Sequence, residues 1–433
     1  MRRASRTFPH SSWSSPTRNP NSKKSSKIHS AAAARRHTPT MAAELVRELG
    51  EIEELVEEIL IRLLKDESGN LLRSFLVCKP WRDLLAGDGF RRRYGDFHRT
   101  PPMLGFFHIW PEPCAEFIPT TDFVAPDLNP RHHYSVEDCR HGRVLLRYID
   151  EDENIPLLVV WDPMTGSETL LGSLEKLGTG SWSASVLCAA DNCRHGDCQS
   201  GPFRVVFVFL HHEEEVATAC VYSSETGSWS SSAVTDVGTF EDEIHFSMPS
   251  VLAGDVLYFL LFRGQDVEGC SILKYDLGTS CLSEIHLSEE IQDAINSPIL
   301  IASDDGRLGL ADLFNFELSI WWREVDPDGV ASWAERRDID LETLLPTGDF
   351  KISPELVGSI EGTDIIFATT SLGTYEIDLK SLTSPLKMLS SWLNQDPNVK
   401  WTILPYVSFY YPPAVDGIVD EESSEDGHGN EEA

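Results

Sequence analysis

Four side chains that could bind a metal ion lie close together in the sequence. Cys188, Cys193, His195 and Cys198 fall within eleven residues, and thiolates with an imidazole are ligands that Zn²⁺ takes in proteins. The spacing C-x4-C-x-H-x2-C is not that of a standard zinc knuckle, and the stretch is polar and lies between two strand-like segments. We therefore interpret the four residues as incidental thiols and imidazole of a loop, and the sequence predicts neither a metal site nor a cofactor.

Three further groups contain residue types that catalysis uses. His211-His212 precedes three glutamates, but the stretch lies between two strand-like runs and is typical of an exposed hairpin tip. A nucleophilic thiol in Cys139-Arg140-His141 would need a lowered pKa and a positioned base, and a turn leading into a strand is favoured. Trp321-Trp322 could line a ligand cage, although core packing is favoured. No P-loop, GxGxxG, GxSxG or HExxH motif is present, so no catalytic residue is predicted.

The elements that must position these side chains repeat along the chain. A glycine precedes a β-type run at intervals of 52 to 59 residues, and a second β-run then ends in a turn rich in Asp, Gly, Pro or Ser. Repeats of about 50 residues built from antiparallel strands are the signature of a β-propeller blade. The glycines are Gly142, Gly201, Gly254, Gly306 and Gly362.

Residues 100–413 have room for about six blades of this length. Five repeats are visible, and we expect both ends of the region to complete the sixth. Met103–Ile109 and Glu116–Thr120 would come from the N-terminal side, and Trp401–Tyr411 from the C-terminal side. Such closure removes the exposed sheet edges that promote aggregation. A seven-bladed ring or an open pair of β-sandwiches stays as the alternative.

A small all-α module is predicted at residues 45–97, before the all-β propeller. Apolar residues recur on one helix face, and Asn70 and Pro80 suit the starts of two further short helices. About fifty residues are marginal for an independent core. The module also has more apolar helix surface than three short helices can bury, so we expect a partner to cover part of it. The first stripe consists of Ile52, Leu55, Val56, Ile59, Leu60, Leu63 and Leu64.

The run Glu54–Leu84 resembles an F-box, above all in the string Val77-Cys78-Lys79-Pro80-Trp81-Arg82. The stretch Phe90–His108 is similar to the segment after the F-box in a large plant group of F-box proteins, and the repeats resemble kelch-like F-box-associated propellers without a clear Gly-Gly doublet. The prolines that commonly flank the first F-box helix are absent at Glu51-Ile52 and Leu64.

The resemblance implies the substrate-receptor subunit of an SCF-type cullin–RING ubiquitin ligase, which is not itself an enzyme. Its partners would be a Skp-type adaptor, a cullin reached through the adaptor, and an unknown substrate protein bound by the propeller. A non-ligase scaffold with a decayed F-box, and a propeller enzyme with an unrecognised channel site, stay as alternatives. The residues that would form or support the adaptor face are Leu55, Ile59, Leu63, Val77, Cys78 and Trp81.

Charge and composition limit the other classes of function. The net charge of −33 repels a phosphate backbone, so a general nucleic-acid binder is not expected. Apolar runs are too short for a membrane helix, which needs about 18 residues. The nine irregularly spaced cysteines are typical of thiols in a reducing compartment, and we expect a nuclear or cytoplasmic protein, or both.

Both ends of the chain differ from the rest. Residues 1–40 hold nine basic residues and no acidic one, and residues 414–433 form an acidic tail; both are predicted to be disordered. The basic segment is read as having little function or as an upstream extension of a chain that starts at Met41. An organelle transit peptide, or a nuclear signal at Lys23–Lys27, remains an alternative.

Overall fold

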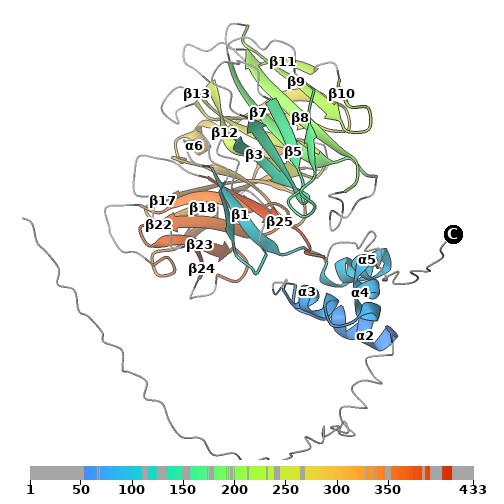
Figure 1. The fold of residues 1–433 in the computed structure, drawn as a ribbon. Coiled ribbons are helices and arrows are strands. Elements are labelled where there is room, and N and C mark those ends of the chain that lie inside the picture. The colour runs from blue at the N-terminus through green and yellow to red at the C-terminus, as the bar shows by residue number, and fades with distance from the viewer. Residues whose placement is uncertain are drawn as a thin grey trace, which may run out of the picture. The chain divides into compact units, whose positions relative to one another are not determined.

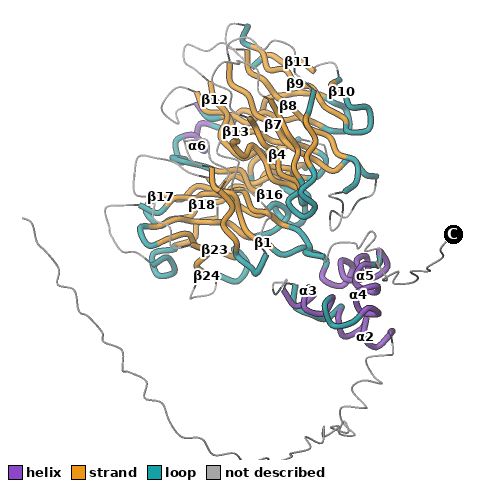
Figure 2. The backbone as a smooth tube through the Cα atoms, in the orientation of Figure 1, coloured by secondary structure: helices purple, strands orange, loops and turns teal. Residues whose placement is uncertain are grey.

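The computed structural model describes residues 53–411 with gaps, and the segments 1–40 and 414–433 lie outside the described residues (Figures 1 and 2). The gaps are residues 66, 68, 110–115, 124–133, 149–156, 173, 175–179, 192, 194, 196–197, 199, 212–213, 231–232, 238–243, 264–268, 327, 329, 335–336, 347–352, 383–385 and 391–401. None of the described helices is long and apolar enough to cross a membrane.

Four short helices precede the strands in the described part of the chain, where the sequence predicted three. Pro80 stands in the first turn of its helix, as expected. The extra helix follows Gly87, which ends one helix and caps the next. The first helix ends at Leu60, earlier than its apolar stripe suggested. The helices are α2 (Glu53–Leu60), α3 (Gly69–Phe75), α4 (Lys79–Ala86) and α5 (Asp88–His98).

The strands form six antiparallel sheets, the blades of a propeller (Figure 1). The first three blades are β2-β1-β25 (Glu116–Pro119, Met103–Ile109, Thr402–Val407), β3 to β6 (Tyr134–Arg140, Arg143–Tyr148, Leu157–Trp161, Glu168–Leu170) and β7 to β11 (Gly180–Cys188, Phe203–His211, Val216–Ser223, Ser228–Trp229, Ala233–Asp236). The other three are β12 to β15 (Ile244–Ala253, Val256–Arg263, Ser271–Asp276, Cys281–His286), β16 to β20 (Ile299–Ala302, Leu308–Phe314, Glu317–Val325, Ala331–Trp333, Arg337–Asp340) and β21 to β24 (Glu355–Ile360, Ile365–Thr370, Gly373–Asp378, Lys387–Ser390).

The five repeat glycines precede the second strand of five of the six blades. Gly142, Gly254, Gly306 and Gly362 have φ values between 62° and 79°, a region that residues with a Cβ seldom adopt. In these four blades the periodic glycine signal therefore reports a turn that the backbone needs before the second strand.

The predicted closure of the ring is confirmed. β1 pairs antiparallel with β25, with Phe107 opposite Leu404, and with β2 on its other side. The first and last strands of the propeller thus share one blade, and the prediction of six blades is confirmed. The seven-bladed ring and the pair of sandwiches are wrong.

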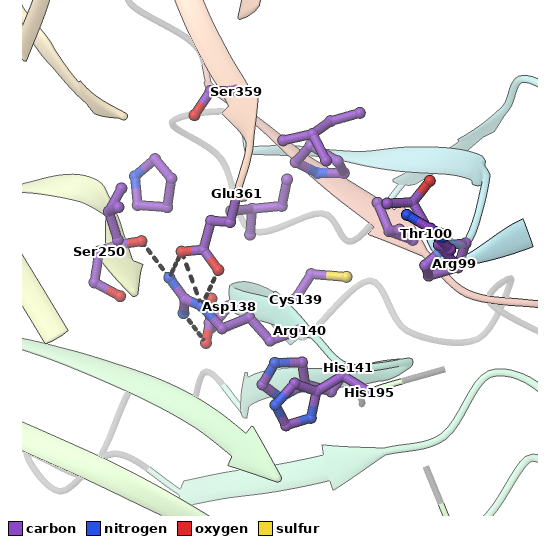
Figure 3. A pocket seen from close by; sticks show the side chains of 17 residues that line it. Arg99, Thr100, Asp138, Cys139, Arg140, His141, His195, Ser250, Ser359 and Glu361 are labelled. Atoms are coloured by element: carbon purple, nitrogen blue, oxygen red, sulfur yellow. Dashed lines mark hydrogen bonds and ion pairs between the residues drawn. The ribbon is translucent and has the colours of Figure 1, made fainter. Parts of the chain in front are cut away.

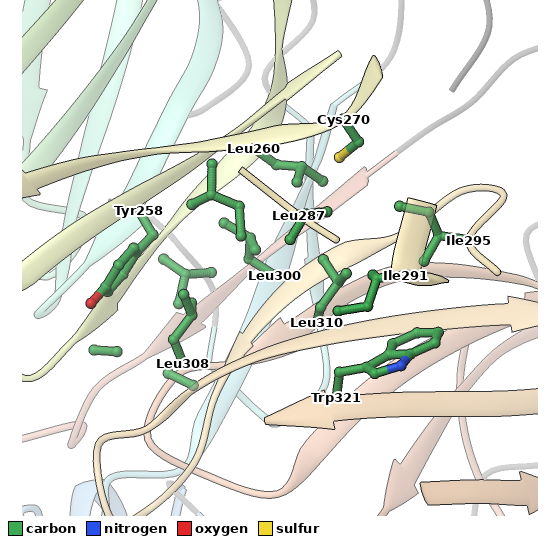
Figure 4. Close-up of a cluster of buried hydrophobic side chains, with 14 residues drawn as sticks. Tyr258, Leu260, Cys270, Leu287, Ile291, Ile295, Leu300, Leu308, Leu310 and Trp321 are labelled. Carbon is green, nitrogen blue, oxygen red and sulfur yellow. The ribbon is translucent and has the colours of Figure 1, made fainter. Parts of the chain in front are cut away.

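Apolar side chains pack between adjacent blades. One such cluster joins Tyr258 and Leu260 of β13 to Leu310 of β17 and to Ile291 of the short helix α6 (Glu289–Gln292) (Figure 4). Trp321 belongs to this cluster and is 5% exposed. The prediction that it packs in the core, and not in a ligand cage, is therefore confirmed.

Candidate functional site

Two of the residues predicted to face an adaptor lie on the outer side of α2. Leu55 and Ile59 are 38% and 56% exposed, whereas Val56 and Leu60 are buried. Residues four apart lie on the same face of a helix, so Leu55 and Ile59 form one apolar face that points to solvent. The single stripe predicted from the sequence is therefore divided between the module's core and its surface.

Three of the other predicted residues lie at or near the start of α4, and Leu63 follows the end of α2. Val77 and Cys78 are exposed between α3 and α4. Leu63 and Trp81 are half-buried and pack against the core of the helical module. Four of the six residues are thus exposed to solvent, and the other two pack against the module's core.

The chain itself covers part of the apolar helix surface. Beyond β25, Phe409 and Tyr411 are buried in the same cluster as Leu60 and Tyr94. The Tyr94 ring meets the rings of Phe409 and Tyr411 edge-on at 5.6 and 6.1 Å, and the Tyr411 hydroxyl donates a hydrogen bond to the Arg91 carbonyl at 3.1 Å. The C-terminal segment thus completes this core and buries part of the apolar helix surface for which a partner was expected.

A cavity of about 270 Å³ opens over a buried ion cluster that joins several blades (Figure 3). Arg140, at the end of β3, forms ion pairs with Asp138 and Glu361 at 2.5 Å each, and donates a hydrogen bond to the Ser250 carbonyl. Asp138 also accepts the Val186 N–H at 2.7 Å, and Glu361 accepts the Leu252 N–H at 2.8 Å. The guanidinium thus links β3, β12 and the turn after β21.

Burial dominates the electrostatics of this cluster. It raises the pKa of Asp138 to about 6, although the Arg140 charge lowers it. Burial also raises the pKa of the neighbouring Cys139 thiol well above its usual range. A thiol nucleophile needs the opposite shift, so the geometry favours a structural role for Cys139-Arg140-His141, as the sequence suggested.

His211 was the other imidazole singled out in the sequence. It ends β8 at the predicted hairpin, and its Nε2 lies 3.0 Å from the Thr218 hydroxyl. His212 and Glu213 lie outside the described residues.

The four cysteine and histidine residues at positions 188–198, which the sequence analysis placed in a loop, lie close together in the structure. The ligand atoms of Cys188, Cys193, His195 and Cys198 all lie within 4.8 Å of one another. The interpretation of these residues as incidental does not account for that convergence.

Residues 135–350 match the family model described as "F-box protein AT5G49610-like, beta-propeller". The match runs from β3 to beyond β20 and so covers four of the six blades. No curated protein matches the chain.

Solved structures also match the chain, all at low identity and low TM-score. A chain of a nidogen/laminin complex is 13% identical with a TM-score of 0.38, over 70% of this chain and 99% of that one. A luciferin-regenerating enzyme is 10% identical with a TM-score of 0.34, over 72% and 95%. The Penicillium chrysogenum α-L-arabinanase is 8% identical with a TM-score of 0.36, over 70% and 98%.

These TM-scores are too low to carry an argument about function, so only the family model bears on the type of propeller. It matches the blades that hold Asp138, Arg140 and the four converging cysteine and histidine side chains, whereas Glu361 of the ion cluster lies beyond the match. Residues 135–350 therefore form a propeller segment of the type found in F-box proteins.

Proposed function

We propose that the chain is the substrate-receptor subunit of an SCF-type cullin–RING ubiquitin ligase. The helical module would bind a Skp-type adaptor, and the kelch-like propeller would bind the substrate protein. The observation that carries the proposal is the exposed apolar face at Leu55 and Ile59, within a run that resembles an F-box and precedes an F-box-type propeller.

The energetics of this face favour a partner. Burying a leucine or isoleucine side chain that was exposed contributes about 1.5–3 kcal/mol, and an exposed apolar helix face suits a groove or another helix. Val77 and Cys78 extend the exposed set at the start of α4, while Leu63 and Trp81 would hold the helices in place from the core side.

The protein would act by proximity and not by chemistry of its own. A receptor that holds its substrate near a ubiquitin-loaded enzyme raises the effective concentration of the reacting groups. Such a role needs a firm link between the adaptor-binding module and the propeller. Phe409 and Tyr411 supply one, because they continue directly from β25 of the ring into the core of the helical module.

The two alternative functions, a scaffold with a decayed F-box and a channel enzyme, differ from the ligase subunit in testable ways. A scaffold with a decayed F-box would keep the propeller's partners and lose the adaptor. A channel enzyme would need free acid–base groups, but Asp138 and Glu361 are paired with Arg140, which supports a structural role for them. We place the protein in the nucleus or cytoplasm, or both.

Paired charge substitutions on the exposed face test the adaptor interface. Leu55→Asp with Ile59→Asp should weaken binding of a purified Skp-type adaptor at least about a hundredfold, since anchors at an interface contribute about 2 kcal/mol or more each. Both side chains are exposed, so the helices should stay folded. Calorimetric titration of the full chain measures the affinity, and circular dichroism checks the fold.

Val330→Asp is the matched control, because Val330 is 62% exposed on the propeller. It should bind the adaptor as the wild type does. Undiminished binding by the double variant would contradict the assigned face.

A further inference from the structure

We infer that Cys188, Cys193, His195 and Cys198 bind one structural Zn²⁺ ion, independently of the proposed ligase function. Their ligand atoms lie within 4.8 Å of one another, and the Cys198 Sγ is 3.8 Å from the His195 Nδ1. A tetrahedral zinc ion with three sulfurs and one nitrogen needs separations of about 3.5–3.8 Å. Small side-chain movements therefore complete the site.

The backbone brings the four ligands together at the end of a hairpin. Cys188 is the last residue of β7, and the other three lie in the connection to β8. The Ala189 N–H donates to the Pro202 carbonyl at 2.9 Å, and the Gly201 N–H to the Cys198 carbonyl at 3.0 Å. These bonds turn the connection back, so that a nonstandard spacing still converges.

Two sulfurs accept hydrogen bonds from the backbone. The Ala190 N–H lies 3.4 Å from the Cys188 Sγ, and the His195 N–H lies 3.3 Å from the Cys193 Sγ. Both donors stand two residues after the cysteine that they contact. Hydrogen bonds to the charged form of a ligand stabilise that form, and metal sites use such outer contacts to orient their ligands. The two contacts therefore help to orient the sulfurs of Cys188 and Cys193.

His141 acts as a positioning residue for two of the ligands. Its Nδ1 accepts the Cys188 N–H at 3.1 Å, and its ring stacks on the His195 ring at 3.8 Å with an angle of 15° between the planes (Figure 3). His141 and Gly142 both have positive φ, as a two-residue turn between antiparallel strands requires. The β3–β4 turn of one blade thus supports the ligand loop of the next.

A buried cation compensates the charge that the site would carry. Three thiolates, a neutral imidazole and Zn²⁺ sum to a charge of −1. Arg143 is 1% exposed beside the loop, and its guanidinium donates to the carbonyls of Cys198 and Gly201. Its Nη1 is buried without a hydrogen-bond partner among the described residues. An unneutralised guanidinium is costly there, and an anionic metal centre next to it removes part of that cost.

The three sulfurs and one imidazole indicate which metal would bind and whether its role would be structural or catalytic. Three sulfurs and an imidazole suit zinc far better than magnesium or calcium, which prefer oxygen. Four protein ligands leave no open position, and closed sites of this kind are structural. His195 lines the cavity over the Arg140 cluster, and Cys193 lines a second cavity against α5. The zinc would therefore fix the wall between these two cavities.

Metal analysis of the full chain tests the inference. The protein is purified under reducing conditions with a tag that contains no histidine, and zinc is measured by mass spectrometry. We expect about one zinc per chain, and cobalt substitution should give the visible absorption of a tetrahedral thiolate site. Cys193→Ser, which changes a half-buried ligand, and Cys198→Ser should each lower the zinc content at least tenfold. Cys281→Ser, at an exposed cysteine elsewhere in the propeller, should retain the metal.

Chelation provides a readout that does not depend on variants. Removal of zinc should lower the thermal midpoint of the wild type, and added zinc should restore it. A folded wild type that takes up neither zinc nor cobalt overturns the inference. So does full zinc retention in both folded variants, Cys193→Ser and Cys198→Ser, or a chelated, reduced wild type whose thermal midpoint does not change when zinc is added.

Discussion

A chain that ends at residue 401 should fail to form a stable propeller. The truncation removes β25, the strand that pairs with β1 and closes the ring. Ile403, Leu404 and Tyr406 are at most 2% exposed, and each buried large side chain contributes about 2–5 kcal/mol. Their sum approaches or exceeds the total stability of about 5–15 kcal/mol that folded proteins have. We expect loss of the cooperative thermal transition and aggregation through the open edge of β1.

The helical module should be lost at the same time. Phe409 and Tyr411 are part of its core, so the truncation leaves α2 and α5 with an exposed apolar surface. A chain that ends at Tyr411 is the matched control, because it lacks only residues outside the described part of the structure; its thermal midpoint should equal that of the full chain. A soluble, monomeric truncation at residue 401 with an unchanged midpoint would show that β25 does not close the ring.

Replacing Arg140 with leucine should destabilise the propeller by about 3–5 kcal/mol, the cost of breaking a buried ion pair on one side. Arg140 is 7% exposed, and Asp138 is 2% exposed. Without the guanidinium, the Asp138 carboxylate stays buried beside Glu361. Among the described residues, the Val186 N–H still donates a hydrogen bond to it. Urea unfolding followed by tryptophan fluorescence measures the loss.

The destabilisation should depend on pH in a defined direction. Burial already raises the Asp138 pKa from 3.8 to about 6 in the wild type, so the folded chain binds that proton more tightly than the unfolded chain. This tighter proton binding by Asp138 stabilises the folded state fully below the unfolded pKa, and the stabilisation is lost as the pH rises through the folded pKa. Loss of the Arg140 charge raises the pKa further, so the variant should be weakest near neutral pH and recover toward about pH 5.

Two further variants serve as controls for the loss of stability in Arg140→Leu. Asp138→Asn together with Arg140→Leu should recover part of the loss, because it removes the unpaired charge. Arg73→Leu, at an exposed ion pair with Asp122, should cost at most about 1 kcal/mol. An Arg140→Leu variant as stable as the wild type at every pH would mean that the cluster does not hold the blades together.

The sequence predicted the features that recur from blade to blade, because the same kinds of turn and strand residues repeat along the chain. Four of the six blades have a turn with positive φ before their second strand, and Gly142, Gly254, Gly306 and Gly362 provide it. The closing blade could also be placed, because Met103–Ile109 is strand-like and stands apart from the repeats. Periodicity, together with the length of residues 100–413 and the strand-like segments at both ends, was therefore enough for the propeller and its number of blades.

The features that the sequence did not predict depend on contacts between distant residues. Docking of Phe409 against Tyr94 joins segments more than 300 positions apart, and no periodic signal marks it. The division of the α2 stripe into buried Val56 and exposed Leu55 depends on where the other helices lie. The four cysteine and histidine side chains converge because β7, β8 and the His141 turn fix both ends of their loop. The spacing of the residues in the sequence does not contain this information.

Co-purification from cells tests the central claim most directly. The full-length chain is captured with a small peptide tag, and bound proteins are identified by mass spectrometry and quantified against capture of the chain with Leu55→Asp and Ile59→Asp. The account predicts a Skp-type adaptor and a cullin with the wild type, and depletion of both with the double variant. A wild type that is folded and captures neither protein would contradict the claim that this chain is a subunit of a cullin–RING ubiquitin ligase.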